Sequence, residues 1–266
     1  MLTRENYIQS QPEIQPELLH FFDRTDSLII FDIGACEAED SIRYSNLFPN
    51  SSIYAFEPRQ DNCKRADDLI KEYNKSNIVL ENIALSKENG NAKFYLSEGE
   101  PQHLKNDENW NYGNKSSSLL PPSKEMRSHI EWLNFNNWIE VKTIKLEDYV
   151  EKKKISMIDL AHIDVQGAEL IVLQGAGIFL KKIKLIWMEV ESVQLYENQP
   201  IKRDIELFMN SNNFTNILDT VDTLSGDQLY VNREYFSDDQ IKSATLLRRR
   251  TPIGLMSKLK SLLKLY

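Results

Sequence analysis

Two segments of the chain share one order of residue types: an apolar strand runs into Asp and Gly and then into a helix. They are residues 31–41 (FDIGACEAEDS) and residues 161–170 (AHIDVQGAEL). In a parallel α/β sheet such strands end at one edge, where their polar residues gather around a ligand. We therefore expect an α/β protein with a ligand site at the carboxyl edge of its sheet.

Along most of the chain, apolar runs of strand length alternate with segments whose apolar residues recur at the spacing of a helix. Strands are predicted at residues 27–33, 52–57, 78–85, 93–96, 139–144, 157–164, 184–190, 216–219 and 228–231. Helices are predicted at residues 17–24, 39–48, 61–73, 123–133, 146–152, 168–173 and 201–212. The fourth strand follows Glu88-Asn89-Gly90, which is a hairpin signal. This order predicts a doubly wound, mostly parallel sheet with an antiparallel strand pair at its C-terminal end.

The sequence predicts one main domain at residues 1–247. Residues 97–138 interrupt the strand and helix rhythm and are rich in Asn, Ser, Pro and Trp. An insertion of this length inside a compact domain is typical of a lid or a binding element. Its Trp and Tyr rings and its hydroxyls suit a carbohydrate or polyketide surface, and burial of the rings against the sheet is an equal alternative.

Charge and cysteine content narrow the class of protein further. The chain has 266 residues and a net charge of −8, and the insertion has no basic stripe, so we expect no nucleic acid partner. A disulfide at Cys36 would tether the loop that must approach a ligand, which favours a reducing compartment. With no long apolar run in the sequence, we expect a cytoplasmic protein.

The C-terminal segment, residues 248–266, reads as a separate basic amphipathic helix. It contains six basic residues and no acidic one, and its apolar residues fall on one side of a helical wheel. Such a helix can lie on an anionic membrane surface, here at the inner face of the membrane. The alternative is that it docks on the acidic body of this protein or on a partner chain.

The turn after the first strand contains one glycine, Gly34, and lacks the G-x-G-x-x-G pattern of a dinucleotide site. Glu57 ends the second strand, where a carboxylate can accept both hydroxyls of an adenosine ribose. That adenosine could belong to NAD or to S-adenosylmethionine, and the missing glycines argue against a pyrophosphate. A tight turn without a ligand and a solvated Glu57 are the plainer alternatives.

Taken in order, the motifs of this chain resemble the FkbM family of S-adenosylmethionine-dependent methyltransferases. The matching pieces are residues 31–35 with 40–41, 55–58, 82–86, 116–119, 141–149, 158–169 and 173–176. The resemblance covers about residues 27–232.

The resemblance implies a class I methyltransferase (Rossmann-like) fold with S-adenosylmethionine as cofactor. It implies cofactor contacts from Asp32, Gly34 and Ala35 to the methionine and ribose part, from Glu57 to the ribose, and from Asn82 and Ile83 to the adenine. The chain departs from the family at two positions. Ala38 stands where many relatives have another glycine, and His162 stands where the family commonly has Lys.

His162 and Asp164 lie two residues apart on a strand, so both side chains leave the same face near its end. An imidazole with a pKa near neutral suits a general base that takes the proton of a methyl acceptor. We therefore predict His162 and Asp164 as catalytic residues. The alternative for His162 is a histidine hydrogen-bonded inside the core.

Substrate-binding residues are predicted on two further segments. Glu189 and Glu191 share one face at the end of their strand, and Ser117 and Ser118 lie in the insertion. The two glutamates beside Asp164 could instead hold a divalent metal, although hydrogen bonds to substrate hydroxyls explain them equally, and no metal site is predicted. Glu169 is expected to serve the backbone amides at the start of its helix.

The sequence therefore predicts an S-adenosylmethionine-dependent O-methyltransferase that acts on a hydroxyl of a small molecule, specifically a sugar of a glycan or glycolipid. The sugar preference rests on the resemblance, the aromatic insertion and the basic tail. The alternatives are an N-methyltransferase, a metal-assisted reaction, and a binding module that keeps the cofactor pocket without turnover. The sequence leaves the oligomeric state open.

Overall fold

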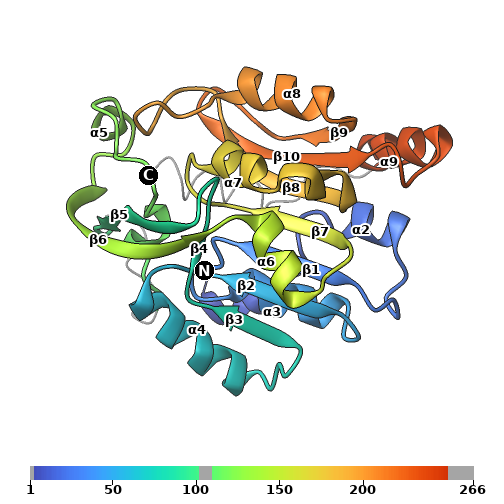
Figure 1. Ribbon diagram of the computed structural model, residues 1–266, viewed down its shortest axis with the longest axis horizontal. Coiled ribbons are helices and arrows are strands. Elements are labelled where there is room, and N and C mark those ends of the chain that lie inside the picture. Colours follow the sequence, from blue (N-terminus) through green and yellow to red (C-terminus); the bar gives the residue numbers. More distant parts are fainter. Residues whose placement is uncertain (1–2, 102–109, 251–266) are drawn as a thin grey trace.

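A seven-stranded sheet with the order β3-β2-β1-β7-β8-β10-β9 forms the centre of the molecule (Figure 1). The computed structural model describes residues 3–101 and 110–250. The strands of this sheet are β1 (Ile29–Ile33), β2 (Ser52–Phe56), β3 (Ile78–Glu81), β7 (Ile158–Ile163), β8 (Ile183–Glu191), β9 (Phe214–Asp219) and β10 (Ser225–Asn232). Neighbours from β3 to β8 are parallel, and β10 is antiparallel to both β8 and β9. The predicted fold class is confirmed.

Helices cover both faces of the sheet because successive strand residues point to opposite sides. Ile30 and Leu160 belong to one core with α2, α3, α4 and α9, and Phe31 and Ala161 belong to the other with α6, α7 and α8. The helices on the first face are α2 (Gln15–Phe21), α3 (Glu39–Leu47), α4 (Gln60–Glu72) and α9 (Asp238–Arg250). Those on the second face are α6 (Leu146–Lys153), α7 (Glu169–Gly175) and α8 (Lys202–Ser211).

A second sheet of three strands has the order β4-β6-β5 and lies at the left of Figure 1. It consists of β4 (Ala84–Leu85), β5 (Gly90–Glu98) and β6 (Asn134–Ile144). The predicted hairpin at Asn89 is wrong, because β6 pairs with both β4 and β5 and separates them. The Asn89 side chain instead bonds to Lys145 and Asp148, so this loop docks at the start of α6.

The insertion has less helix than its apolar spacing predicts. A 3-10 helix, η1 (Gly113–Ser116), and one short α-helix, α5 (Met126–His129), are its helical parts within the described residues. Met126, Ile130 and Leu133 are buried against Leu195 and Tyr196. Burial in this small cluster satisfies the apolar positions without a longer helix, and the chain enters β6 at Asn134.

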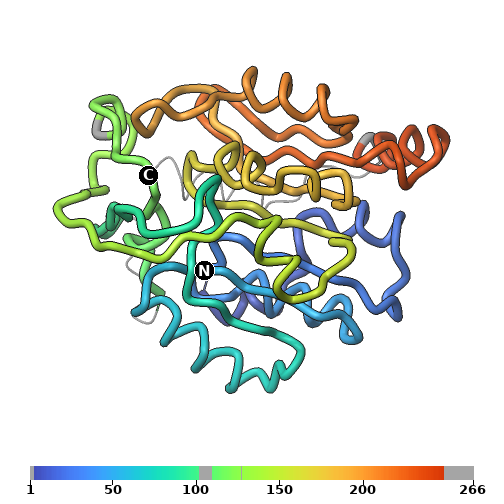
Figure 2. The backbone as a smooth tube through the Cα atoms, in the orientation of Figure 1, coloured from blue at the N-terminus to red at the C-terminus, as the bar shows by residue number. Residues whose placement is uncertain are grey.

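Two terminal helices lie outside the elements predicted from sequence: α1 (Arg4–Gln9) and α9. Helices α2 and α9, from opposite ends of the described chain, lie side by side at the right of Figure 2 and are in contact. Arg248 in α9 donates to the buried carboxylate of Glu17. The first basic residue of the predicted tail therefore docks on the body of the protein, and residues 251–266 lie outside the described residues.

No helix within the described ranges combines the length and the apolar character that a membrane span requires.

Candidate active site

The turns that follow β1, β2 and β7 are held together by backbone hydrogen bonds. Gly34 and Ala35 donate to the Phe56 carbonyl, each at 3.0 Å, and Asp164 donates to the Ile33 carbonyl at 2.9 Å. Gly34 has φ +89°, and a Cβ at this position would lie 1.9 Å from the Asp164 carbonyl oxygen. Only glycine fits here, because a side chain would collide with the neighbouring turn.

A first cavity of about 510 Å³ opens beside these turns. Its apolar walls include Ile33, Phe56, Ile83, Leu85 and Phe94. The polar groups at its edge include Glu57, Asn62, Lys115, Asp164 and Gln166. A cavity with apolar walls and a carboxylate among its lining residues can accept a nucleoside, because the base needs apolar faces and the ribose needs acceptors.

Glu57 is the buried carboxylate of the first cavity. It accepts the backbone N–H of Cys36 at 3.0 Å and that of Arg59 at 2.7 Å. Burial raises the pKa of Glu57 to about 8, although these two hydrogen bonds oppose the shift. Each carboxylate oxygen accepts more than one hydrogen bond, so Glu57 keeps acceptor capacity for a ligand.

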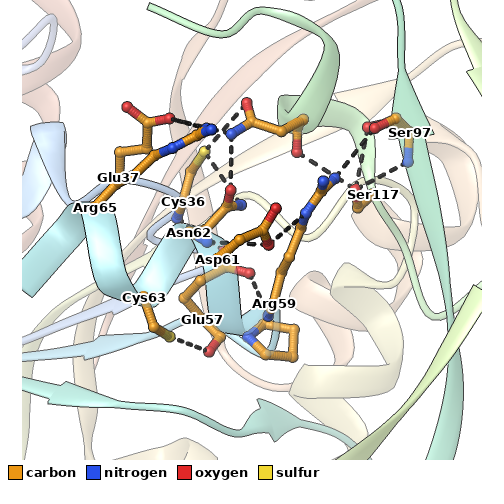
Figure 3. A network of polar contacts seen from close by, with 12 residues as sticks. Cys36, Glu37, Glu57, Arg59, Asp61, Asn62, Cys63, Arg65, Ser97 and Ser117 are labelled. Atoms are coloured by element: carbon orange, nitrogen blue, oxygen red, sulfur yellow. Dashed lines mark hydrogen bonds and ion pairs between the residues drawn. The ribbon is translucent and has the colours of Figure 1, made fainter.

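The Glu57 turn is joined to the insertion through Arg59 (Figure 3). The Arg59 guanidinium donates to Asp61 at 2.7 Å and to the Ser97 carbonyl at 3.2 Å. Ser117 in turn accepts the Ser97 backbone N–H at 3.0 Å. The wall of the first cavity is thus fixed on two sides, by the sheet and by the insertion.

A second, larger cavity of about 1200 Å³ adjoins the first. The residues that line both cavities are Gly34, Cys36, Lys115, Asp164 and Gln166. The carboxylates that line the larger cavity are Asp32, Glu39, Asp40, Asp164, Glu189 and Glu191, and its aromatic side chains are Tyr7, Trp110, Tyr112 and Trp132. The two cavities therefore meet at the ends of β1 and β7.

His162 and Asp32 lie next to each other on the floor of the larger cavity. They are register partners on β7 and β1, and His162 Nδ1 lies 3.4 Å from Asp32 Oδ1. Ser41 donates to the other oxygen of Asp32 at 2.5 Å. The His162 and Tyr44 rings also pack in a T-shaped arrangement, with the two ring centroids 5.7 Å apart. Both side chains are held in place, and both are only slightly exposed.

Comparison with known proteins places this architecture in a family. The sequence model of the methyltransferase FkbM domain matches residues 32–215, which contain the three turns and most of both cavity walls. This chain belongs to the FkbM methyltransferase family. It is a methyltransferase that uses S-adenosylmethionine.

Two similar proteins are informative. The chain is 27% identical over 199 residues to the 2-O-methyltransferase NoeI of Sinorhizobium fredii, covering 74% of this chain and 77% of NoeI. Its fold is similar to the solved structure of methyltransferase FkbM from Methylobacillus flagellatus KT, with a TM-score of 0.52 and 12% identity. That similarity covers 86% of this chain and 50% of the Methylobacillus chain, so the present chain spans half the length of that protein.

The first cavity suits the cofactor of the family. S-adenosylmethionine has an adenine, a ribose diol and a methionine part, and the cavity offers apolar walls, a buried carboxylate and the closely packed Gly34 turn. The larger cavity adjoins it at Asp164 and leaves room for a methyl acceptor.

Most residues predicted from the sequence line one of the two cavities. These are Asp32, Gly34, Ala35, Glu57, Ile83, Ser117, His162, Asp164, Glu189 and Glu191. Asn82 and Ser118 line neither. Asn82 donates to the Glu57 and Pro58 carbonyls, and buried Ser118 donates to the Gln166 carbonyl at 2.7 Å. Both side chains hold neighbouring turns in position.

Gln166 is a site residue that the sequence reasoning missed. Its side-chain amide donates to Asp164 at 2.6 Å and also to Glu189, and its Oε1 accepts a hydrogen bond from Tyr196 at 3.3 Å. Its backbone has φ +56°, a left-handed conformation that is uncommon outside glycine. The sequence shows only that a polar side chain, Gln166, directly precedes Gly167 at the end of this strand. The partners of that side chain could not be predicted from the sequence.

Glu37 and Glu39 were also missed, and they anchor the part of the insertion that we call the lid segment (residues 110–118). Trp110 donates to Glu39 at 2.6 Å and Lys115 donates to it at 2.9 Å. Asn114 donates to Glu37 at 3.1 Å. Both glutamates are buried and follow Gly34 by three and five residues. Their bonds therefore attach the lid segment next to the Gly34 turn.

The remaining acidic residues of the site differ in their surroundings. Glu169 accepts the backbone N–H groups of Val165 and Gly167, as expected from the sequence. Burial and the nearby charge of Asp164 raise the pKa of Glu169 to about 7, against the hydrogen bonds that it accepts.

Within the described ranges, no group of three His, Cys, Asp or Glu side chains has the arrangement that holds a metal ion.

Proposed function

We propose that this protein transfers the methyl group of S-adenosylmethionine to a hydroxyl group of a sugar in a glycan or glycolipid. The observation that carries the proposal is that the two cavities meet at Asp164 beside His162. A cofactor in the first cavity would therefore face an acceptor in the second. The relative NoeI is named a 2-O-methyltransferase, which favours an oxygen acceptor over a nitrogen.

The first cavity would hold the adenosine part of the cofactor, with Glu57 at its ribose and Ile83 at its adenine. Its methionine part would pass Gly34, which lines both cavities, toward Asp32 and Ala35 in the larger cavity. When bound, it supplies an electrophilic methyl group on a sulfonium. His162 accepts the proton of the acceptor hydroxyl as the oxygen attacks, and the carboxylate of Asp32 at 3.4 Å stabilises the resulting imidazolium. Asp164, held by Gln166, orients the hydroxyl between the two cavities.

The walls of the larger cavity support a sugar as acceptor. Carboxylates such as Glu189 and Glu191 accept hydrogen bonds from hydroxyls, and the rings of Trp110 and Tyr112 offer flat apolar faces. Trp132 adds an indole N–H that is buried and has no hydrogen-bond partner among the described residues. A polyhydroxylated ring presents apolar faces, donors and acceptors, and so matches all three kinds of group.

An acceptor panel tests the proposal. The purified full chain is incubated with S-adenosylmethionine and with oligosaccharides, phenols or amines, and products are analysed by mass spectrometry for the gain of one CH₂ unit. We expect methylation of sugar hydroxyls and equimolar S-adenosylhomocysteine. Methylation of phenols or amines alone would overturn the sugar assignment and leave the methyltransferase activity intact.

We also propose that residues 248–266 bring the protein to an anionic membrane, where lipid-linked glycans are accessible. Flotation with vesicles that contain an anionic lipid compares the full chain with a chain that ends at residue 250. Loss of flotation in the shorter chain is the expected result, and equal flotation of both would contradict the membrane role.

A further inference from the structure

The methionine part of S-adenosylmethionine carries an ammonium and a carboxylate, and a cofactor in the first cavity, as proposed above, would extend this part to the region where the two cavities meet. That region is strongly acidic, because six carboxylates line the larger cavity. An additional anion would be repelled there unless a cation lay next to it. The cofactor's ammonium and sulfonium suit these carboxylates, whereas its own carboxylate needs a positive group beside the Gly34 turn.

Lys115 is such a group. Among the described residues that line either cavity, it is the only lysine or arginine, and it lines both. It lies in η1 of the lid segment, directly above the Gly34 turn. Its Nζ is 2.9 Å from Glu39 Oε1, 3.9 Å from Cys36 Sγ and 5.1 Å from the centroid of the Trp110 ring.

The charge and the hydrogen-bonding capacity of Lys115 suit an anionic ligand. Burial lowers the pKa of its ammonium, but nearby Cys36, Glu39 and Glu37 outweigh this effect and keep the pKa above its usual value. Lys115 therefore stays charged at neutral pH. An ammonium has three N–H donors, and Glu39 and Cys36 use two of them.

We propose that Lys115 binds the carboxylate of the cofactor's methionine part and so fastens the lid segment over the bound cofactor. Glu39 positions the ammonium of Lys115 through their ion pair and offsets part of its positive charge. A ligand that carries this carboxylate then adds a contact between itself and the lid segment. The proposal concerns the cofactor alone, so it stands or falls independently of which hydroxyl is methylated.

A comparison of two ligands tests this proposal. S-adenosylhomocysteine carries the carboxylate, whereas 5′-methylthioadenosine has the same adenosine and sulfur without the amino acid. Calorimetry measures both affinities in the wild-type chain and in Lys115→Met. We expect the variant to lose about 10- to 100-fold in affinity for S-adenosylhomocysteine, the range for one charge-assisted hydrogen bond, and less than about threefold for 5′-methylthioadenosine.

Matched variants make the result specific. Lys115→Arg keeps the charge and is expected to retain most of the affinity, and Lys93→Met removes a lysine that lies over the exposed Trp138 ring, outside both cavities. If Lys115→Met does not fold, Lys115→Gln is measured with the same two ligands. Equal losses for both ligands, or no loss for either, would overturn the proposal.

Discussion

The floor and the lid of this active site are built from different interactions. On the floor, the turns after β1, β2 and β7 are joined by backbone hydrogen bonds and by the close approach of Gly34 to Asp164. In the lid segment, Trp110, Asn114 and Lys115 reach the Gly34 turn through their side chains. Changes to the backbone turns of the floor should therefore affect folding and all binding, whereas changes to single side chains of the floor or the lid should affect selected ligands or steps.

The largest effect is expected for Gly34→Ala on the floor. The new Cβ would overlap the Asp164 carbonyl, and φ +89° disfavours any side chain. We expect a loss of about 3–5 kcal/mol in the free energy of unfolding and loss of cofactor binding, measured by urea unfolding and calorimetry.

Gly90→Ala is the matched control for this change. It has φ +143° and nothing within 4 Å of its new Cβ, so it should lose only about 1–2 kcal/mol. If the two variants were equally stable, the close approach at Gly34 would not be what fixes the floor.

The second effect concerns catalysis on the floor. His162→Ala should lower kcat by about 10²- to 10⁴-fold while the affinity for S-adenosylhomocysteine changes by less than about threefold, because a general base acts only in the reaction. Steady-state kinetics and calorimetry measure the two quantities. His20→Ala, which changes a partly buried histidine on α2 outside both cavities, is the control. A rate close to wild type would exclude His162 as the base and favour Asp164.

A smaller effect is expected where the lid meets the floor. Gln166→Leu removes the amide that holds Asp164 and Glu189, and we expect kcat/KM for the acceptor to fall by about 10- to 100-fold. Tyr196→Phe removes only the hydroxyl that bonds to Ser116 and Gln166, and a loss of about three- to tenfold is expected. If Tyr196→Phe were the more damaging change, the lid contact would matter more than the position of Asp164.

An effect of comparable size is a pH dependence at Glu57. With a pKa of about 8 in the free protein, this carboxyl is mostly neutral at pH 7 and mostly ionised at pH 9. Ribose hydroxyls donate to the ionised form, so the affinity for 5′-methylthioadenosine, which does not titrate in this range, should rise about tenfold between these pH values.

The variant Glu57→Gln tests whether Glu57 is the group whose ionisation changes the affinity. This variant should bind 5′-methylthioadenosine with an affinity that does not change between pH 7 and 9. A wild-type affinity that falls as the pH rises would mean that the neutral acid is the form that binds the ribose.

The floor could be predicted from the sequence to a large extent. Strand and helix periods are local, so the chain indicated β1, β2, β7 and β8, the glycine turn and the acidic residue at the end of β2. Parallel strands end at a shared edge, which brought Asp32, Glu57, His162 and Asp164 into one region. The hairpin expected at Asn89 failed because β6, more than 40 residues later, pairs with both strands on either side of that turn.

The sequence by itself determined the doubly wound sheet, the family and the residues at the strand ends, because each of these follows from local residue order. The tertiary structure alone decided that Glu37 and Glu39 hold the lid segment, that Gln166 joins two carboxylates, and that Lys115 lies between the two cavities. These contacts join side chains that lie far apart in the chain or depend on an unusual backbone angle. No periodic pattern records such contacts, since they arise only when the packed elements bring the side chains together.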